Sequence, residues 1–171
     1  MTAHEQSQAS RAVIALGANL GDPIAALQGA VDALNAHPQV EVVAASDVYE
    51  TDPVGGIEQP VFCNAMVLVR TTLDPHALLD LAHRIEEDWQ RTREVRWGPR
   101  TLDIDLIDFE GVTLDGPDLV LPHPRAHERG FVLVPWRAIE PDGALTGHGP
   151  ISDLPVDTAG VRATDHRLSL Q

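Results

Sequence analysis

Apolar side chains recur along this chain with two different periods, and each period predicts one kind of element. Apolar residues spaced three and four apart predict two helices, at residues 24–34 and 78–89. An aspartate–proline pair precedes each helix, as is typical of an N-cap followed by a proline in the first turn. Runs of apolar and β-branched residues, one of them cleanly alternating, predict four strands at residues 11–16, 40–49, 61–72 and 101–109.

The order of these elements, β-α-β-β-α-β, favours one α+β domain. Two helices on one face of an antiparallel sheet, the split βαβ arrangement, would bury both sets of apolar residues. We expect this domain at residues 11–141, with an added hairpin turning at 115–117 and a last helix around 129–139. We expect residues 1–10 to form a flexible N-terminus. Residues 142–171 carry no clear pattern, so we expect a loosely held C-terminal tail.

The charge of the chain is strongly negative. It has 26 acidic and 12 basic side chains, a formal net charge of −14, and all the basic residues are arginines. The absence of lysine excludes a P-loop lysine and a Schiff-base lysine. The charge argues against nucleic acid as a partner, because a phosphate backbone attracts positive charge. A small anionic ligand is compatible with it if the arginines are gathered in one place.

Other features of the sequence favour the cytoplasm. No apolar run approaches the roughly 18 residues that cross a membrane, and the first residues lack the pattern of a signal peptide. The single cysteine, Cys63, cannot form an internal disulfide and fits a reducing compartment. We therefore expect a cytoplasmic protein, a monomer, with no membrane partner.

The strongest candidate for chemistry is a pair of aspartates on a predicted strand. Asp103 and Asp105 share one face of that strand, and their spacing suits Mg²⁺ bound together with phosphate oxygens. Four arginines precede them within ten residues: Arg91, Arg93, Arg96 and Arg100. Guanidinium groups beside carboxylates match a metal–polyphosphate ligand. A solvated strand face with surface ion pairs is the alternative.

A second constellation lies at the other predicted hairpin. The loop at residues 51–60 contains two prolines and two glycines, and Phe62 and Asn64 follow it on one face of a strand. An aromatic ring and a side-chain amide can sandwich and hydrogen-bond a flat heterocycle. Trp97, beside the arginines, fits a similar role or a place in the core. Without further context, a packed phenylalanine and a turn-supporting asparagine are the favoured alternative. Cys63 between them is expected to be a small core residue.

Three motifs together carry a resemblance. They are Gly-Ala-Asn-Leu-Gly at 17–21, Arg-Trp-Gly-Pro-Arg-Thr-Leu-Asp-Ile-Asp-Leu at 96–106, and Leu-Pro-His-Pro at 121–124 followed by Arg-Gly-Phe at 129–131. The chain resembles the 6-hydroxymethyl-7,8-dihydropterin pyrophosphokinases of folate biosynthesis, over roughly residues 11–141 and in the right order. The second motif is highly specific, whereas the first alone would be weak.

The resemblance implies a ferredoxin-like α+β fold and transfer of the β,γ-diphosphate of ATP to the pterin's hydroxymethyl oxygen, with release of AMP. It implies two Mg²⁺ ions on Asp103 and Asp105, with Arg93 and Arg100 also catalytic. The residues it implies for ATP are Glu86, Arg91, Arg93, Trp97, Arg100, Leu119, His123 and Arg129. Those it implies for the pterin are Thr51, Pro53, Val54, Gly55, Phe62, Asn64, Trp97 and Phe131.

Two other classes of function stay open from the residues alone. A non-catalytic ligand-sensing domain on the same scaffold would need a pocket but no metal pair, so Asp103 and Asp105 discriminate against it. An RNA-binding module of related topology would need basic charge and stacked aromatic residues on a central strand. The net charge and the scarcity of aromatic residues oppose it.

Overall fold

The structure is a computed structural model, and it describes residues 9–19, 21–52, 61–92 and 102–170. Its centre is an antiparallel sheet with the strand order β10-β3-β4-β1-β5, and β2 also pairs with β4. The strands are β1 (Ser10–Ala18), β2 (Val40–Ala45), β3 (Tyr49–Thr51), β4 (Phe62–Thr71), β5 (Leu102–Phe109) and β10 (Val161–Ala163). The predicted antiparallel α+β fold is confirmed.

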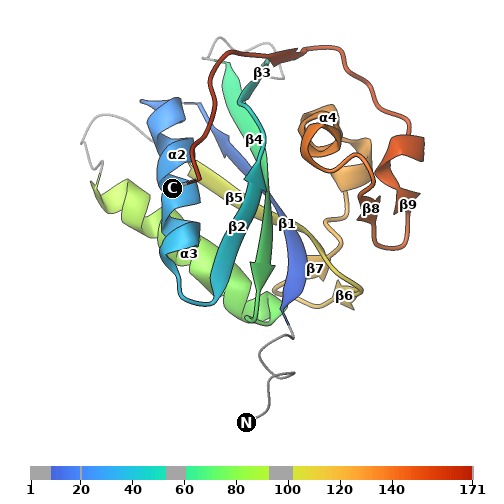
Figure 1. Cartoon of the computed structure of the whole chain (residues 1–171), viewed down its shortest axis with the longest axis horizontal. Helices are drawn as coiled ribbons and strands as arrows, with labels where there is room; N and C mark the ends of the chain where they lie inside the picture. The colour runs from blue at the N-terminus through green and yellow to red at the C-terminus, as the bar shows by residue number, and fades with distance from the viewer. Residues whose placement is uncertain (1–8, 20, 53–60, 93–101, 171) are drawn as a thin grey trace.

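Helices cover both faces of this sheet, so the molecule has three layers (Figure 1). Helices α2 (Pro23–Ala36) and α3 (Pro75–Thr92) cover one face, and α4 (Gly130–Ile139) covers the other. Both predicted caps are present: Asp22 accepts a hydrogen bond from the backbone of Ala25 over 3.1 Å, and Asp74 from Ala77 over 2.8 Å. The short remaining elements are β6 (Leu114–Asp115), β7 (Val120–Leu121), η1 (Ala126–Glu128), β8 (Ala144–Leu145), β9 (Gly149–Pro150) and η2 (Ile151–Asp153).

Each face of the sheet has its own core. The larger core contains Leu102, Ile104 and Leu106 of β5 together with buried residues of α2 and α3. This is the arrangement predicted for the apolar face of that strand. The smaller core lies under α4 and surrounds the fully buried Trp136. None of the helices in the described ranges is long and apolar enough to cross a membrane.

Two local predictions were wrong. The predicted strand at 40–49 is interrupted at Ser46, whose hydroxyl accepts a hydrogen bond from the backbone of Met66 over 2.9 Å. The side chain thus replaces a strand carbonyl at this point and lets the chain bend between β2 and β3. The turn predicted to begin at Gly17 also starts later, because β1 continues through Gly17 and Ala18 while paired with both β4 and β5.

The expectation of a loosely held C-terminal tail is contradicted as well. β10 pairs with β3, Leu145 and Ile151 are buried in the core under α4, and Leu168 is buried in the larger core. Near its end, Ser169 exchanges two hydrogen bonds with the side chain of Gln28 in α2, over 2.9 and 3.0 Å. The segment therefore runs from the layer of α4, past the end of the sheet, to the layer of α2 (Figure 1).

Candidate active site

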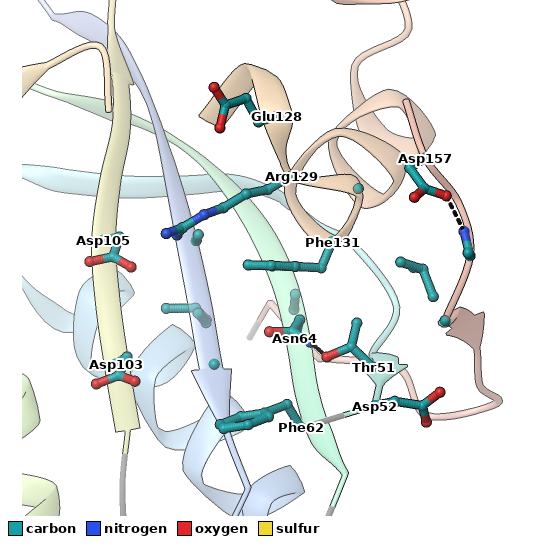
Figure 2. Close-up of a pocket in the computed structure, with 18 residues that line it drawn as sticks. Thr51, Asp52, Phe62, Asn64, Asp103, Asp105, Glu128, Arg129, Phe131 and Asp157 are labelled. Carbon is teal, nitrogen blue, oxygen red and sulfur yellow. Dashed lines mark hydrogen bonds between the residues drawn. The ribbon is translucent and has the colours of Figure 1, made fainter. Parts of the chain in front are cut away.

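A cavity of about 740 Å³ lies between the sheet and the N-terminal end of α4. Its floor comes from β1, β4 and β5, and its other walls come from η1, α4, the end of β3 and the C-terminal segment. Figure 2 shows the side chains that line it. The residues predicted from the sequence that line it are Thr51, Phe62, Asn64, Asp103, Asp105, Arg129 and Phe131.

Asp103 and Asp105 form one end of the cavity. β5 is the outermost strand on its side of the sheet, and its pairing places Asp103 beside Gly17 and Asp105 beside Ala15 of β1. Both carboxylates lie on the face opposite the larger core and point into the cavity (Figure 2). Partial burial and, next, the charge of Asp105 raise the pKa of Asp103. A bound cation would relieve this repulsion.

This donor set fits a cation that takes further ligands from a substrate. Within the described part of the chain, no group of three or more His, Cys, Asp or Glu side chains is arranged to hold a metal ion. Two carboxylates are nevertheless what Mg²⁺ takes from a protein when phosphate oxygens and water complete its coordination. The pair therefore suits a metal that arrives with a nucleotide.

Arg129 brings positive charge to this end. It is the last residue before α4, and its guanidinium carbon lies 5.5 Å from the centre of the Phe131 ring. The side chain reaches across the cavity toward Asp105 (Figure 2). One side chain therefore spans the space between the aromatic part of the cavity and the carboxylates.

The other end of the cavity is aromatic and amide-lined. Phe131 of α4 and Phe62 of β4 both project into the cavity, and Asn64 lies deeper on the same face as Phe62 (Figure 2). Asn64 is buried, and its side-chain nitrogen donates a hydrogen bond to the hydroxyl of Thr51 over 3.0 Å. Phe62 and Asn64 thus share one face as predicted, and Cys63 between them is buried in the larger core.

The two residues expected near the nucleoside, Glu86 and Leu119, lie in α3 and just before β7. Glu86 of α3 accepts a hydrogen bond from the backbone nitrogen of Ile104 over 2.7 Å, and burial raises the pKa of its carboxyl. Leu119 is buried in the larger core. Neither side chain is among those lining the described cavity.

His123 precedes η1 and is not among the residues that line the cavity. Burial lowers the pKa of its imidazole, whereas the charge of Asp105 acts in the opposite direction. Its Nδ1 accepts a hydrogen bond from the backbone nitrogen of Arg125 over 3.2 Å. His123 and Asp105 are therefore near enough for their charges to interact.

Several predicted site residues lie outside the described residues: Pro53, Val54, Gly55, Arg93, Trp97 and Arg100. Arg91 belongs to the last turn of α3, which ends at Thr92. β5 begins at Leu102, one residue before Asp103.

Sequence reasoning missed one wall of the cavity. Asp157, Ala159, Gly160 and Val161 line it together with Asp52, and none of them was a candidate. The C-terminal segment is rich in glycine, aspartate and proline, and this composition predicts only a loop. The pairing of β10 with β3 depends on contacts between residues about 110 positions apart, as in the 3.0 Å hydrogen bond from Arg162 to Asp52.

Comparison with known proteins gives a consistent result. The family model for 7,8-dihydro-6-hydroxymethylpterin-pyrophosphokinase matches residues 13–141. Proteins named 2-amino-4-hydroxy-6-hydroxymethyldihydropteridine pyrophosphokinase are similar to this chain. The one from Methylorubrum extorquens is 47% identical over 138 residues, which is 81% of this chain and 87% of that protein. The one from Bacillus subtilis is 48% identical over 128 residues, 75% of this chain and 77% of that protein.

A third relative extends into the C-terminal segment. The protein of the same name from Mycobacterium leprae is 41% identical, and the match covers 95% of this chain and 93% of that protein. Among solved structures, wild-type HPPK-DHPS of Plasmodium falciparum matches with a TM-score of 0.63 and 15% identity, over 85% of this chain and 44% of that chain. This chain thus spans less than half of that larger protein, and the likeness supports the fold alone. With its family model, its relatives and its fold in agreement, the chain belongs to the 7,8-dihydro-6-hydroxymethylpterin-pyrophosphokinase family.

Proposed function

We propose that this chain transfers the β,γ-diphosphate of ATP to the hydroxymethyl oxygen of 6-hydroxymethyl-7,8-dihydropterin, giving AMP and the pterin diphosphate. One observation carries the proposal beyond family membership. A single cavity holds a carboxylate pair with an arginine at one end, and two phenylalanine rings with a buried amide at the other. A flat heterocycle and a polyphosphate would thus meet inside one cavity.

The aromatic end suits the pterin. Phe62 and Phe131 offer apolar ring faces, against which a flat ring system can stack. The amide of Asn64 supplies a donor and an acceptor in a buried position, where an unpaired polar edge of the ligand would be costly. These groups would bind the heterocycle and turn its hydroxymethyl arm toward the aspartate end.

The carboxylate end suits the triphosphate. In this proposal Asp103 and Asp105 hold two Mg²⁺ ions, which supply positive charge to the phosphate oxygens when bound. Arg129, which reaches toward Asp105, would bind phosphate oxygens through its guanidinium group. Arg91, Arg93 and Arg100 would add to this charge, together with His123 at the edge of the site.

The reaction itself requires alignment more than covalent help from the protein. The hydroxymethyl oxygen attacks the β-phosphorus, the bond from that phosphorus to the oxygen of the α-phosphate breaks, and AMP leaves. The chain's contribution is to fix the pterin against Phe131 and Asn64 while the arginines bind the phosphates. Arg93 is assigned to charge that develops during transfer.

The test is an incubation of the purified protein with ATP, Mg²⁺ and the reduced hydroxymethylpterin, followed by separation of the nucleotides. We expect AMP and pterin diphosphate in equal amounts, formed only when both substrates and the metal are present. A ligand-sensing domain on the same scaffold would bind the pterin without consuming ATP. Formation of ADP in place of AMP would contradict the proposal.

A further inference from the structure

The C-terminal segment at residues 157–163, here called the strap, forms a wall of the substrate cavity. We propose that the strap positions Thr51, and through Thr51 the amide of Asn64, for recognition of the heterocycle. This inference rests on the proposed function, because it assigns the pterin to the aromatic end. It concerns residues beyond 141, where the match to the family model ends.

Backbone pairing attaches the strap to the end of the sheet. β10 runs antiparallel to β3, with Val161 opposite Thr51, Arg162 opposite Glu50 and Ala163 opposite Tyr49. β3 has only three residues, and β10 covers the edge that it would otherwise present to solvent (Figure 1). The position of Thr51 is therefore fixed from both sides, by β4 and by the strap.

Charge pairs reinforce this attachment on both sides of Thr51. The guanidinium group of Arg162 lies 3.0 Å from the carboxylate of Asp52 and 3.8 Å from that of Glu50. All three side chains are partly exposed, so each pair contributes little to the stability of the whole protein. Their effect is local, because Arg162 contacts the residues immediately before and after Thr51 and so helps to fix its position.

The strap also contacts α4 at its first residue. A Cβ atom built on Gly130 would lie only 2.3 Å from the backbone oxygen of Asp157, so the strap passes where a side chain would otherwise stand. Gly130 separates Arg129 from Phe131, and both of these line the cavity. The strap is therefore packed against the turn that presents the arginine and one aromatic ring.

The lining of the cavity places the strap at the heterocycle end. Asp157, Ala159, Gly160 and Val161 line it, and Figure 2 shows Asp157 on the far side of Phe131 from Asp103 and Asp105. The hydrogen bond from Asn64 to Thr51 then connects the strap to the buried amide. Loss of the strap should weaken pterin binding and leave the phosphate end intact.

The experiment uses the full-length protein and a reversal of charge. In Arg162→Glu, a new carboxylate faces Asp52 and Glu50 and repels the strap, whereas Arg167→Glu makes the same change of charge at an exposed position outside the strap. Equilibrium titration with the pterin should show affinity about tenfold lower for Arg162→Glu, the size expected for one misplaced hydrogen-bonding group. Affinity for ATP should be unchanged, and Arg162→Lys should restore most of the pterin affinity.

A second pair of variants tests the backbone of the strap. Gly160 and Gly147 both have positive φ, 77° and 81°, so alanine strains either turn, but only Gly160 belongs to the strap. Gly160→Ala should raise the KM for the pterin with little change in kcat, and Gly147→Ala should leave both unchanged.

Three outcomes would overturn the inference. They are an unchanged pterin affinity in Arg162→Glu together with an unchanged KM in Gly160→Ala, an equal loss of affinity for ATP and pterin in Arg162→Glu, and no pterin binding by the wild-type protein. The last would also overturn the proposed function. Pterin binding by the wild type without transfer of the diphosphate would contradict the proposed function alone, since the titrations need no turnover.

Discussion

The buried side-chain amide of Asn64 donates its hydrogen bond to the hydroxyl of Thr51 over 3.0 Å, from the floor of the cavity to its wall. This bond orients the amide, leaving its oxygen and its second N–H for a ligand. The two residues come from β4 and β3, which pair directly beside them. In the proposed function, the amide that would recognise the heterocycle is therefore positioned by a pairing of two strands.

Removal of the amide should weaken pterin binding selectively. In Asn64→Ala, polar atoms of the ligand lose their partner in a buried place, which costs about 1–3 kcal/mol of binding free energy. Thr51→Val keeps the amide but removes the acceptor that orients it, so this variant should lose less of the free energy of pterin binding than Asn64→Ala does. Calorimetric titration with pterin and with ATP separates the two effects. Equal weakening of both ligands would show instead that Asn64 supports the structure of the site.

Neutralising the aspartates should stop the reaction without unfolding the protein. Asp103→Asn and Asp105→Asn remove the charge proposed to bind the metal ions, so turnover should fall by orders of magnitude. Because both side chains lie on the cavity face, away from the larger core, thermal stability should be preserved or slightly raised as their mutual repulsion is relieved. Steady-state rates over a range of Mg²⁺ concentrations check this. Near-normal rates in both variants would contradict the assignment.

The two kinds of arginine should differ in their effects. Arg129 lies across the cavity in the structure, so Arg129→Ala should reduce the affinity for ATP directly. Arg93, outside the described residues, is assigned to the transition state, so Arg93→Ala should bind ATP almost normally and turn over about 10³-fold more slowly. Equilibrium ATP binding beside single-turnover rates distinguishes them. A large loss of ATP affinity in Arg93→Ala, with an unchanged chemical step, would make Arg93 a phosphate ligand of the ground state.

An ion pair far from the cavity should make stability depend on pH. Burial alone would raise the pKa of Glu140, but hydrogen bonds from Arg11 and Trp136 and the charge of Arg11 hold that pKa below its usual value. Ionised Glu140 therefore stabilises the folded state above its unfolded pKa, and this contribution is lost as pH falls through the lower folded pKa.

Glu140→Gln tests this dependence. The free energy of unfolding of the variant should be about 1 kcal/mol lower than that of the wild type at neutral pH, which is the difference between a charged and a neutral hydrogen bond. In acid the unfolding free energies of the two proteins should become equal. Urea unfolding from pH 7 downward measures it, with Asp142→Asn as an exposed control. A difference that grows as pH falls would contradict the assignment.

The helices, the main strands and the aspartate pair could be predicted because local patterns determine them. Apolar and acidic residues alternate along β5, which predicts one face toward the core and the opposite face toward a site. The structure has this arrangement, with Leu102, Ile104 and Leu106 in the larger core and Asp103 and Asp105 lining the cavity. Likewise, Phe62 and Asn64 lie two residues apart and share a face.

What the sequence could not predict depends on distant partners. Ser46 ends β2 because its hydroxyl bonds Met66, and nothing near Ser46 in the chain indicates that bond. The strap is the clearest example, since its residues have weak local preferences and acquire structure only against β3 and Gly130.

The most direct measurement follows the β-phosphorus of ATP. In a single turnover with β-labelled ATP, Mg²⁺ and the reduced hydroxymethylpterin, we expect the label to move to the pterin product at the rate at which AMP forms. Label that stays in a nucleotide would mean transfer of the terminal phosphate only. Label released as free diphosphate would mean that water, and not the pterin held between Phe62 and Phe131, is the acceptor. Either result would contradict diphosphate transfer in this cavity.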